Sequence, residues 1–262
     1  MEYFENSKHI LTYAPSMGIN YLLDETKDEY INLFKRLEKH LSVREISTKY
    51  YIDNLLKNDN TNFVLDPTLL VDVEEYIKLE NKVNNLAQNY ILVICYGGFE
   101  DEQIEFINQY AKETNQEIIQ ISNFVNKDWK YLRTGPSEFL YLIHHANFIF
   151  TDAYHGMLFS IKYNKQFMCF ERINKRTRED GVHWYSRFES IKYILNLKNA
   201  EYKKNLNVKD IRFINYDEVN NSLNYYKKLS YDFIFDELKD ADIIQDKNIK
   251  NKYIKNLGYD KN

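Results

Sequence analysis

The sequence predicts an α/β protein whose second half is built on a parallel β-sheet. Short apolar runs rich in β-branched residues alternate there with segments in which apolar residues recur every three or four positions. This alternation predicts strands at 90–95, 117–121, 148–151 and 166–170, separated by helices at 102–113, 136–146 and 156–163. Strands that alternate with helices form parallel sheets, because each right-handed crossover returns the chain to the same edge.

The helix expected at 136–146 has the clearest boundaries. Pro136 suits the first helical position, where a missing N–H costs no hydrogen bond, and Glu138 lies in the first turn, where negative charge is favourable. His144 and His145 fall in the last turn, where an imidazolium complements the carbonyl end of the helix. We therefore expect a structural role for both histidines.

The first half of the chain is less regular. Thr26-Lys27-Asp28-Glu29 has the pattern of a capping box, which predicts a helix from there to about His40. The elements expected next are a short segment at 43–46, a helix at 47–56 and a strand at 62–65. Proline cannot donate to a strand ladder, so the strand ends at Asp66-Pro67-Thr68.

We expect three parts along the chain. The polar stretch 72–89 carries an expected helical segment around 76–79 and places a boundary near Asn84. Helices are also expected after the last strand, at 187–195 and 217–238. The expected parts are a first domain at 1–84, a second domain at 85–200, and a helical segment with a polar, solvated tail at 201–262.

Composition excludes some classes of protein. The 262 residues are 44% hydrophobic, enough for one large core or two modest ones, and the net charge of −4 gives no broad basic surface for nucleic acid. No apolar stretch approaches the roughly 20 residues that span a bilayer. Cys95 and Cys169 lie in apolar runs, so we expect buried thiols in a cytoplasmic protein that associates at most peripherally with the inner face of the membrane.

The turn Thr151-Asp152-Ala153-Tyr154-His155-Gly156 joins an expected strand to an expected helix. In open parallel sheets, ligands bind beyond the carboxyl ends of strands, where helix N-termini offer N–H groups and partial positive charge. Gly156 would let backbone approach a ligand, His155 can exchange a proton near neutral pH, and Asp152 could orient the imidazole. The alternative is that Asp152 caps the helix and His155 binds nothing.

Other candidate motifs are weaker. Gly97-Gly98 follows the strand expected at 90–95 but lacks a complete glycine-rich phosphate fingerprint. The Thr-Asp-x-x-His-Gly spacing is not that of metal ligands, and the nearest other histidines, His144 and His145, lie on a different element. We therefore expect no metal.

Several segments together resemble the polysaccharide pyruvyl transferase family. The core of the match covers Pro136–Leu140, Ala146–Gly156 and Phe159-Ser160. Further segments that agree in order are Tyr13–Gly18, Val43–Glu45, Leu65–Leu70 and Ser186-Arg187. The agreement runs from about Ile10 to Leu195.

The resemblance implies a GT-B-like fold of two Rossmann-like domains, the second with helices on both faces of its sheet, and an active site in the cleft between them. It implies transfer of a pyruvyl group from phosphoenolpyruvate to a sugar of a surface glycan, such as an exopolysaccharide, or of its lipid-linked precursor. No cofactor is needed, since phosphoenolpyruvate is the donor substrate. His155 is similar to the family histidine proposed for this site and is our candidate general acid, with Asp152 as the second candidate catalytic residue.

The donor's carboxylate and phosphate require positive groups, and arginine binds such anions at two points. Arg44 in Val-Arg-Glu is the first candidate, and Arg187 in the Ser-Arg pair is the second. Arg172, with Lys175, Arg176 and Arg178, forms a basic loop after the last strand. Asp66 and Thr68 end a strand and are further substrate-binding candidates, although a strand followed by proline needs such a turn in any case.

Two departures from the family pattern leave alternatives open. A strand-helix-strand block with an early glycine-rich loop is expected before Ile10 and is not in this sequence, so the first domain reads as incomplete. Ala153 stands where the family more often has serine. The alternatives are a GT-B glycosyltransferase that uses a sugar nucleotide, and a non-catalytic member that needs a partner chain. A homo-oligomer is also compatible with the sequence.

Overall fold

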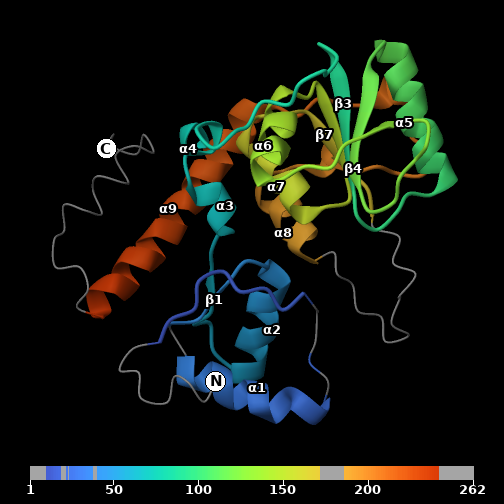
Figure 1. The fold of residues 1–262 in the computed structure, drawn as a ribbon. Helices are drawn as coiled ribbons and strands as arrows, with labels where there is room; N and C mark the ends of the chain where they lie inside the picture. The colour runs from blue at the N-terminus through green and yellow to red at the C-terminus, as the bar shows by residue number, and fades with distance from the viewer. Residues whose placement is uncertain (1–9, 19–21, 23, 38–39, 172–185, 242–262) are drawn as a thin grey trace. The chain divides into compact units, whose positions relative to one another are not determined.

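The computed structural model describes residues 10–18, 22, 24–37, 40–171 and 186–241, which belong to two compact units (Figure 1). The segments of unit 1 are Met1–Leu70, Arg178–Leu195 and Asn220–Asn262, and those of unit 2 are Val71–Thr177 and Asn196–Val219. The units group the chain differently from the boundaries expected at 84 and 200, because helix 186–194 packs with the first segment. Compact units are not the same as sequence domains, so those boundaries stay a prediction.

Unit 2 contains a five-stranded parallel sheet. Its strands are β3 (Tyr90–Cys95), β4 (Glu117–Ser122), β5 (Lys130–Tyr131), β6 (Phe148–Thr151) and β7 (Phe167–Cys169), in the order β5-β4-β3-β6-β7. Every neighbouring pair is parallel. The predicted α/β class is therefore confirmed. Only β5 was not predicted, because two residues at a sheet edge are too few to produce an alternating pattern.

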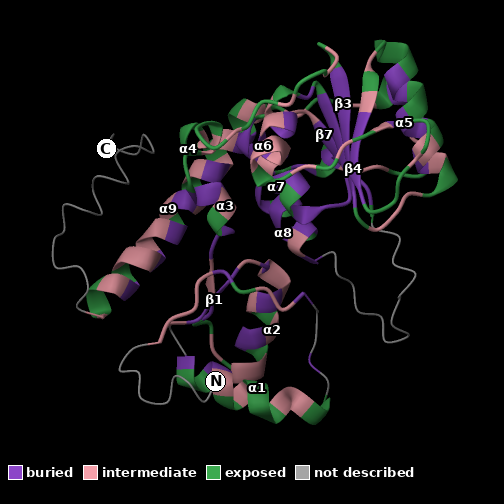
Figure 2. Cartoon of the chain, viewed as in Figure 1, coloured by how far each residue is buried: buried purple, intermediate pink, exposed green. Residues whose placement is uncertain are grey.

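Helices cover both faces of this sheet (Figure 1). On one face α5 (Asp101–Thr114) packs Phe106 and Ile107 against Ile91 and Val93. On the other face lie α6 (Pro136–His145) and α7 (Tyr154–Lys162), and the hydroxyl of Tyr90 donates to the Leu142 carbonyl at 2.7 Å. The central strands are buried along their whole length (Figure 2), as a parallel sheet covered on both faces requires.

The strand order creates a switch point between β3 and β6. From β3 the chain moves through α5 to β4 and β5, and then returns through α6 to the other side of β3. β3 and β6 are paired from Ile91↔Phe148 to Ile94↔Thr151, while α5 and α7 leave their carboxyl ends toward opposite faces. Ligands of open α/β sheets bind at such switch points. The expected turn at 151–156 therefore lies at the best position in this sheet for a site.

Gly156 is where α7 approaches the sheet most closely. A Cβ atom at this position would collide with Thr151 Oγ1 and would lie 3.4 Å from Ile94 Cδ1. The missing side chain thus serves helix packing, and the close backbone approach to a ligand that we expect at Gly156 stays a prediction.

We expect Gly156→Ala to lower the free energy of unfolding by about 1 kcal/mol or more, since overpacking outweighs the gain in helix propensity. Denaturant unfolding of Gly156→Ala in the wild-type and Thr151→Ala backgrounds measures the cause directly. The cost should shrink when Thr151 Oγ1 is absent, and an unchanged cost would contradict this packing role.

Unit 1 contains a two-stranded parallel sheet of β1 (Ser42–Val43) and β2 (Asn62–Phe63). Its helices are α1 (Asp24–Leu37), α2 (Ile46–Leu56), α3 (Pro67–Leu70), α8 (Ser186–Ile194) and the larger part of α9 (Tyr216–Asp240). A cluster of apolar side chains from α1, α2 and β1 forms one core of this unit, with Phe34, Leu37 and Ile52 at its centre. The remaining elements of unit 2 are α4 (Val73–Ile77) and 3-10 turns at Lys198–Ala200 and Val208–Asp210.

Two boundary predictions in the first half were wrong. Helix α1 begins at Asp24, so Thr26 lies inside the first turn and does not cap the helix. Asp24 and Glu25 favour the earlier start because negative charge stabilises a helix N-terminus. The helical segment expected at 76–79 begins earlier, at Val73, after the N-cap residue Asp72.

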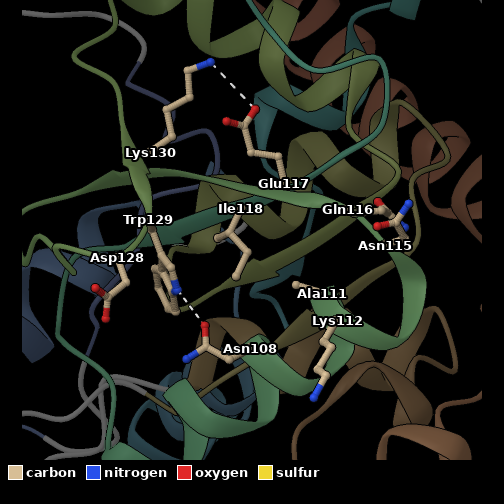
Figure 3. A pocket seen from close by; sticks show the side chains of 10 residues that line it. All are labelled: Asn108, Ala111, Lys112, Asn115, Gln116, Glu117, Ile118, Asp128, Trp129 and Lys130. Carbon is tan, nitrogen blue, oxygen red and sulfur yellow. Dashed lines mark hydrogen bonds and ion pairs between the residues drawn. The ribbon is translucent and has the colours of Figure 1, made fainter.

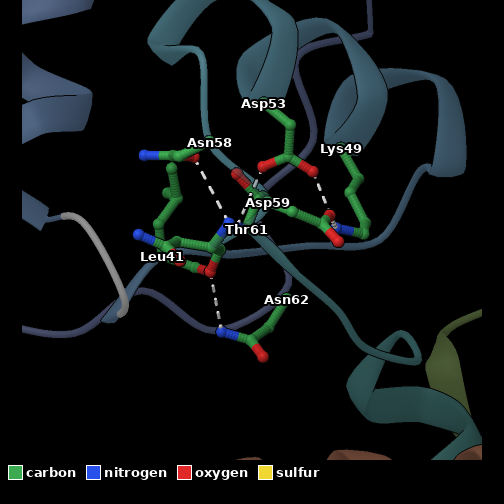
Figure 4. Close-up of polar contacts among 8 residues, drawn as sticks. Leu41, Lys49, Asp53, Asn58, Asp59, Thr61 and Asn62 are labelled. Carbon is green, nitrogen blue, oxygen red and sulfur yellow. Dashed lines mark hydrogen bonds and ion pairs between the residues drawn. The ribbon is translucent and has the colours of Figure 1, made fainter.

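The loop between α2 and β2 is held by a small polar network (Figure 4). Lys49 Nζ lies 2.7 Å from Asp53 Oδ2 and 2.5 Å from Asp59 Oδ1, while the Thr61 N–H donates to Asp53 Oδ1 at 3.0 Å. These bonds fix the start of β2 against the end of α2. Among the described helices, none is both long and apolar enough to cross a membrane.

Candidate functional site

His155 is exposed at the beginning of α7, directly beyond the carboxyl end of β6. The helix begins at Tyr154, and its N-cap residue is Ala153, whose N–H donates to Thr151 Oγ1 at 2.9 Å. The Tyr154 and His155 rings meet edge to face, with centroids 5.4 Å apart. The imidazole is therefore accessible to solvent at the N–H end of a helix, which is an end that attracts an anionic ligand.

Asp152 is buried, with 1% of its surface exposed, and its carboxylate is hydrogen-bonded to the loop after β3. Its carboxylate accepts the Tyr96 N–H at 2.7 Å and the Gly97 N–H, and its own N–H donates to the Ile94 carbonyl at 3.1 Å. The idea that Asp152 caps the helix was wrong, because Ala153 occupies the N-cap position. Asp152 instead ties together the carboxyl ends of β3 and β6, which are the two strands of the switch point.

The loop after β3 leads into a helix that carries its own cap. Gly98 has a φ of 92°, which favours glycine. Glu100 and Gln103 form a reciprocal capping box at the start of α5, so a carboxylate already occupies that helix N-terminus. An anion is therefore more favourable at α7, whose N-cap is an alanine, than at α5.

Cys95 lies beneath this loop, with Sγ 3.9 Å from Asp152 Oδ2. Cys95 and Cys169 are buried free thiols, as predicted. Burial raises the pKa of the Cys95 thiol from 9.0 to about 12, and the Asp152 charge adds to the effect. Above pH 9 the unfolded chain loses this proton while the folded chain keeps it. The stabilising contribution is therefore complete below pH 9 and is lost as the pH rises toward 12.

The raised pKa of Cys95 predicts that the free energy of unfolding falls measurably as the pH rises above 9. Between pH 9 and 10 the Cys95 thiol should remove about 1 kcal/mol from the free energy of unfolding. Urea titrations at several pH values from 8 to 10.5 should show a steeper decline for the wild-type chain than for Cys95→Ala. Buried tyrosines contribute equally to the wild-type chain and to Cys95→Ala. If the free energy of unfolding declined with pH in parallel for the two proteins, Cys95 would not be keeping its proton.

The candidates in the first half of the chain lie in unit 1, where Arg44 and Asp66 form a pair. Arg44 Nη1 lies 2.5 Å from Asp66 Oδ2, and the side chains are 18% and 2% exposed. Asp66 also accepts the Thr68 N–H at 3.0 Å through Oδ1, at the start of α3. Three of the predicted site residues are thus brought together, with Asp66 holding the guanidinium in place.

The segments that carry the resemblance are joined by hydrogen bonds. Tyr13 donates its hydroxyl proton to the Leu65 carbonyl at 2.9 Å, and Ser16 bonds to the buried carboxylate of Glu45. Sequence reasoning did not identify Ser16 and Glu45 as a pair. Their presence in two matched segments was the only available signal, since a contact across 29 positions leaves no local pattern.

Arg187 is half-buried at the second position of α8. One turn later, the Ser190 hydroxyl accepts the Ile46 N–H at 2.9 Å, which joins α8 to the start of α2, two residues after Arg44. The second arginine candidate therefore belongs to the same unit as the first. Arg172 and the rest of the basic loop lie outside the described residues.

A cavity of about 540 Å³ lies between the end of α5 and the start of β4 (Figure 3). Trp129 Nε1 donates to Asn108 Oδ1 at 2.7 Å, and Lys130 Nζ lies 3.6 Å from Glu117 Oε2. Its lining contains none of the predicted site residues, and β4 begins there, so the cavity is at the amino end of the sheet. It does not belong to the switch-point site.

Two solved structures are weakly similar to this chain. The crystal structure of UDP-GlcNAc 2-epimerase from Methanocaldococcus jannaschii, in complex with UDP-GlcNAc and UDP, is 18% identical at a TM-score of 0.39, covering 76% of this chain and 63% of that one. The wall teichoic acid polymerase TagF is 11% identical at a TM-score of 0.40, covering 95% and 64%.

The chain thus spans less than two thirds of the length of either structure, and these scores indicate only a distant likeness. No curated protein matches it significantly. The sequence profile described as polysaccharide pyruvyl transferase matches residues 3–174, which is more than half of the chain. The protein therefore belongs to the polysaccharide pyruvyl transferase family.

Proposed function

We propose that this protein transfers a pyruvyl group from phosphoenolpyruvate to two hydroxyl groups of a sugar, with His155 as the general acid. The observation that carries the proposal is the exposed imidazole at the start of α7, at the switch point of a sheet in a member of this family. The acceptor is a sugar of a surface glycan or of its lipid-linked precursor, as the family implies.

The reaction makes defined demands on the site. The methylene carbon of the donor takes up a proton and becomes a methyl group, and the neighbouring carbon gains cationic character. Two sugar oxygens bond to that carbon, and its bond to the phosphate oxygen breaks. Of the two hydroxyl protons released, one balances the proton gained by the methyl group and the other leaves with inorganic phosphate. We assign the delivery of the proton to His155, because a histidine can supply a proton near neutral pH and be protonated again.

Purified protein incubated with phosphoenolpyruvate and candidate glycosides should release inorganic phosphate in step with a ketal-bearing product. Phosphate release without a ketal indicates hydrolysis and contradicts the proposal. Thermal shifts provide a second criterion: phosphoenolpyruvate should raise the melting temperature and UDP-sugars should not. The opposite pattern would favour a glycosyltransferase, and a shift with neither donor would favour a non-catalytic role.

Arg44 and Arg187 are our separate proposal for residues that hold the donor's anionic groups. Lysine keeps the charge but loses the planar pair of donors, so Arg44→Lys and Arg187→Lys should raise KM for phosphoenolpyruvate about tenfold or more with a smaller change in kcat. Arg36→Lys, at an exposed position of α1, is the control. Unchanged KM values in both variants would remove these arginines from the site, and Asp66 and Thr68 with them.

A further inference from the structure

We propose that Glu80, His144 and His145 form a binding site for one divalent transition-metal ion of the zinc class, in unit 2 and apart from the switch-point site. One ligand atom of each residue lies within 4.8 Å of the others. His144 and His145 end α6, just before β6 begins at Phe148, so this cluster lies at the amino ends of the strands. His155 lies beyond their carboxyl ends.

The distances suit a shared ion. His144 Nδ1 lies 2.9 Å from Glu80 Oε1, and the two imidazole centroids are 4.7 Å apart. Zinc binds nitrogen and oxygen at about 2.0–2.2 Å, which places two ligands of one ion about 3 Å apart. The Glu80–His144 pair already meets that spacing. The ligand atom of exposed His145 lies within 4.8 Å of the other two, so this side chain must move closer to complete a site of three protein ligands, with further positions open to water.

The surroundings orient the ligands as metal sites require. His145 Nδ1 lies 2.9 Å from the Tyr141 carbonyl, so a proton on Nδ1 leaves Nε2 as the metal-binding atom. The His145 ring stacks on Tyr141 with centroids 4.0 Å apart, and the His144 ring stacks on Tyr163 at 4.7 Å. Each ring therefore has an aromatic neighbour beside Glu80, and His145 is the ligand that shifts when an ion binds.

The segment that carries the Glu80 carboxylate is also held in place. Glu80 has only 8% of its side chain exposed. The next residue, Asn81, donates its N–H to the Ser137 carbonyl and its side-chain amide to Glu138, each at 3.2 Å, which attaches this segment to α6. A second cavity, of about 730 Å³, is lined by Tyr141 and His145 together with the 82–88 segment. Of the three proposed ligands this cavity is lined by His145, and it leaves room for a water ligand on that side.

The residue types select the class of ion. Imidazole nitrogens with one carboxylate suit zinc, nickel, copper and ferrous iron, and they disfavour magnesium and calcium, which prefer oxygen ligands. We expected no metal from the sequence, because the Thr-Asp-x-x-His-Gly spacing is not that of metal ligands and the two histidines lie on a different element. The third ligand, Glu80, is 64 positions before His144, so only folding brings the three together.

The test uses the full chain, purified without a histidine tag and stripped of metal by a chelator. Zinc titrated into the protein should bind at one equivalent per chain. At a zinc concentration 100 times the Kd, the melting temperature should rise by about 5–10 °C. Cobalt should give the weak visible bands of a nitrogen and oxygen site, without the intense near-ultraviolet band of a thiolate ligand.

Glu80→Gln, His144→Ala and His145→Ala should each weaken zinc binding about tenfold or more. His145→Ala is the decisive variant, since the exposed ring can be removed without loss of folding. His40→Ala is the matched control, because His40 belongs to unit 1 and pairs with Glu237. The proposal is overturned if zinc does not saturate the chain, if His145→Ala binds as tightly as wild type, or if His40→Ala loses the ion. If zinc does not saturate the chain, the contact between Glu80 and His144 is an ion pair and not part of a metal site.

Discussion

Replacing His155 with alanine should lower kcat for pyruvyl transfer by about 10²- to 10⁴-fold, the usual contribution of a positioned general acid. The side chain is exposed and no core packing is lost, so the variant should fold and melt like the wild-type chain. KM for phosphoenolpyruvate should change little if His155 acts on the reacting carbon without holding the donor. Phosphate release at saturating donor, measured with initial rates, provides the number.

The pH profile separates a catalytic role from a positioning role. A general acid gives the wild-type enzyme a loss of kcat at high pH as the imidazolium deprotonates, and this limb should disappear in His155→Ala. Glu105→Ala, an exposed residue in the middle of α5, should keep the wild-type rate and profile. Undiminished turnover in His155→Ala would withdraw the catalytic assignment.

Replacing Asp152 with alanine should be the most destabilising single change at the switch point. The carboxylate accepts two backbone N–H groups in a buried environment, and each hydrogen bond to a charged group contributes about 1.5–3 kcal/mol. We therefore expect a loss of about 3–6 kcal/mol in the free energy of unfolding. Because Asp152 joins β3 to β6, the loop from Tyr96 to Gly98 should lose protection from amide exchange as well.

Chemical denaturation with amide hydrogen exchange tests this expectation. Asp152→Asn keeps the volume but presents an amide group to two N–H donors, so it should recover only part of the loss. Asp101→Asn is the matched control at the exposed first residue of α5, and it should cost less than about 1 kcal/mol. If Asp152→Ala lost no more than this control, the carboxylate would not be holding the loop.

Local patterns in the second half were sufficient to predict most of its elements. The strand expected at 90–95 and the strand expected at 148–151 have the same bounds in the structure, and α6 begins at Pro136 as predicted. Buried parallel strands are continuous apolar runs, and helix boundaries carry capping residues that occupy single positions. Both signals are local. The capping box at Thr26 misled because its spacing occurs by chance inside a helix that had already begun.

Sequence also located the turn at 151–156 and the family of the chain, but it did not reveal the structural contacts that two residues of that turn make. Gly156 accommodates Thr151, and Asp152 holds the backbone of Tyr96 and Gly97. Both roles depend on partners that other elements supply.

By itself, then, the sequence determined the α/β class, the strand-helix order in the second half and the histidine at a helix start. Only the tertiary structure decided the strand order that makes a switch point between β3 and β6, the pairing of Arg44 with Asp66, and the gathering of Glu80 with two histidines. The physical reason is the range of the interactions. Periodicity and capping act over a few residues, whereas these contacts join positions 22 to 64 apart, whose proximity depends on how the whole chain packs.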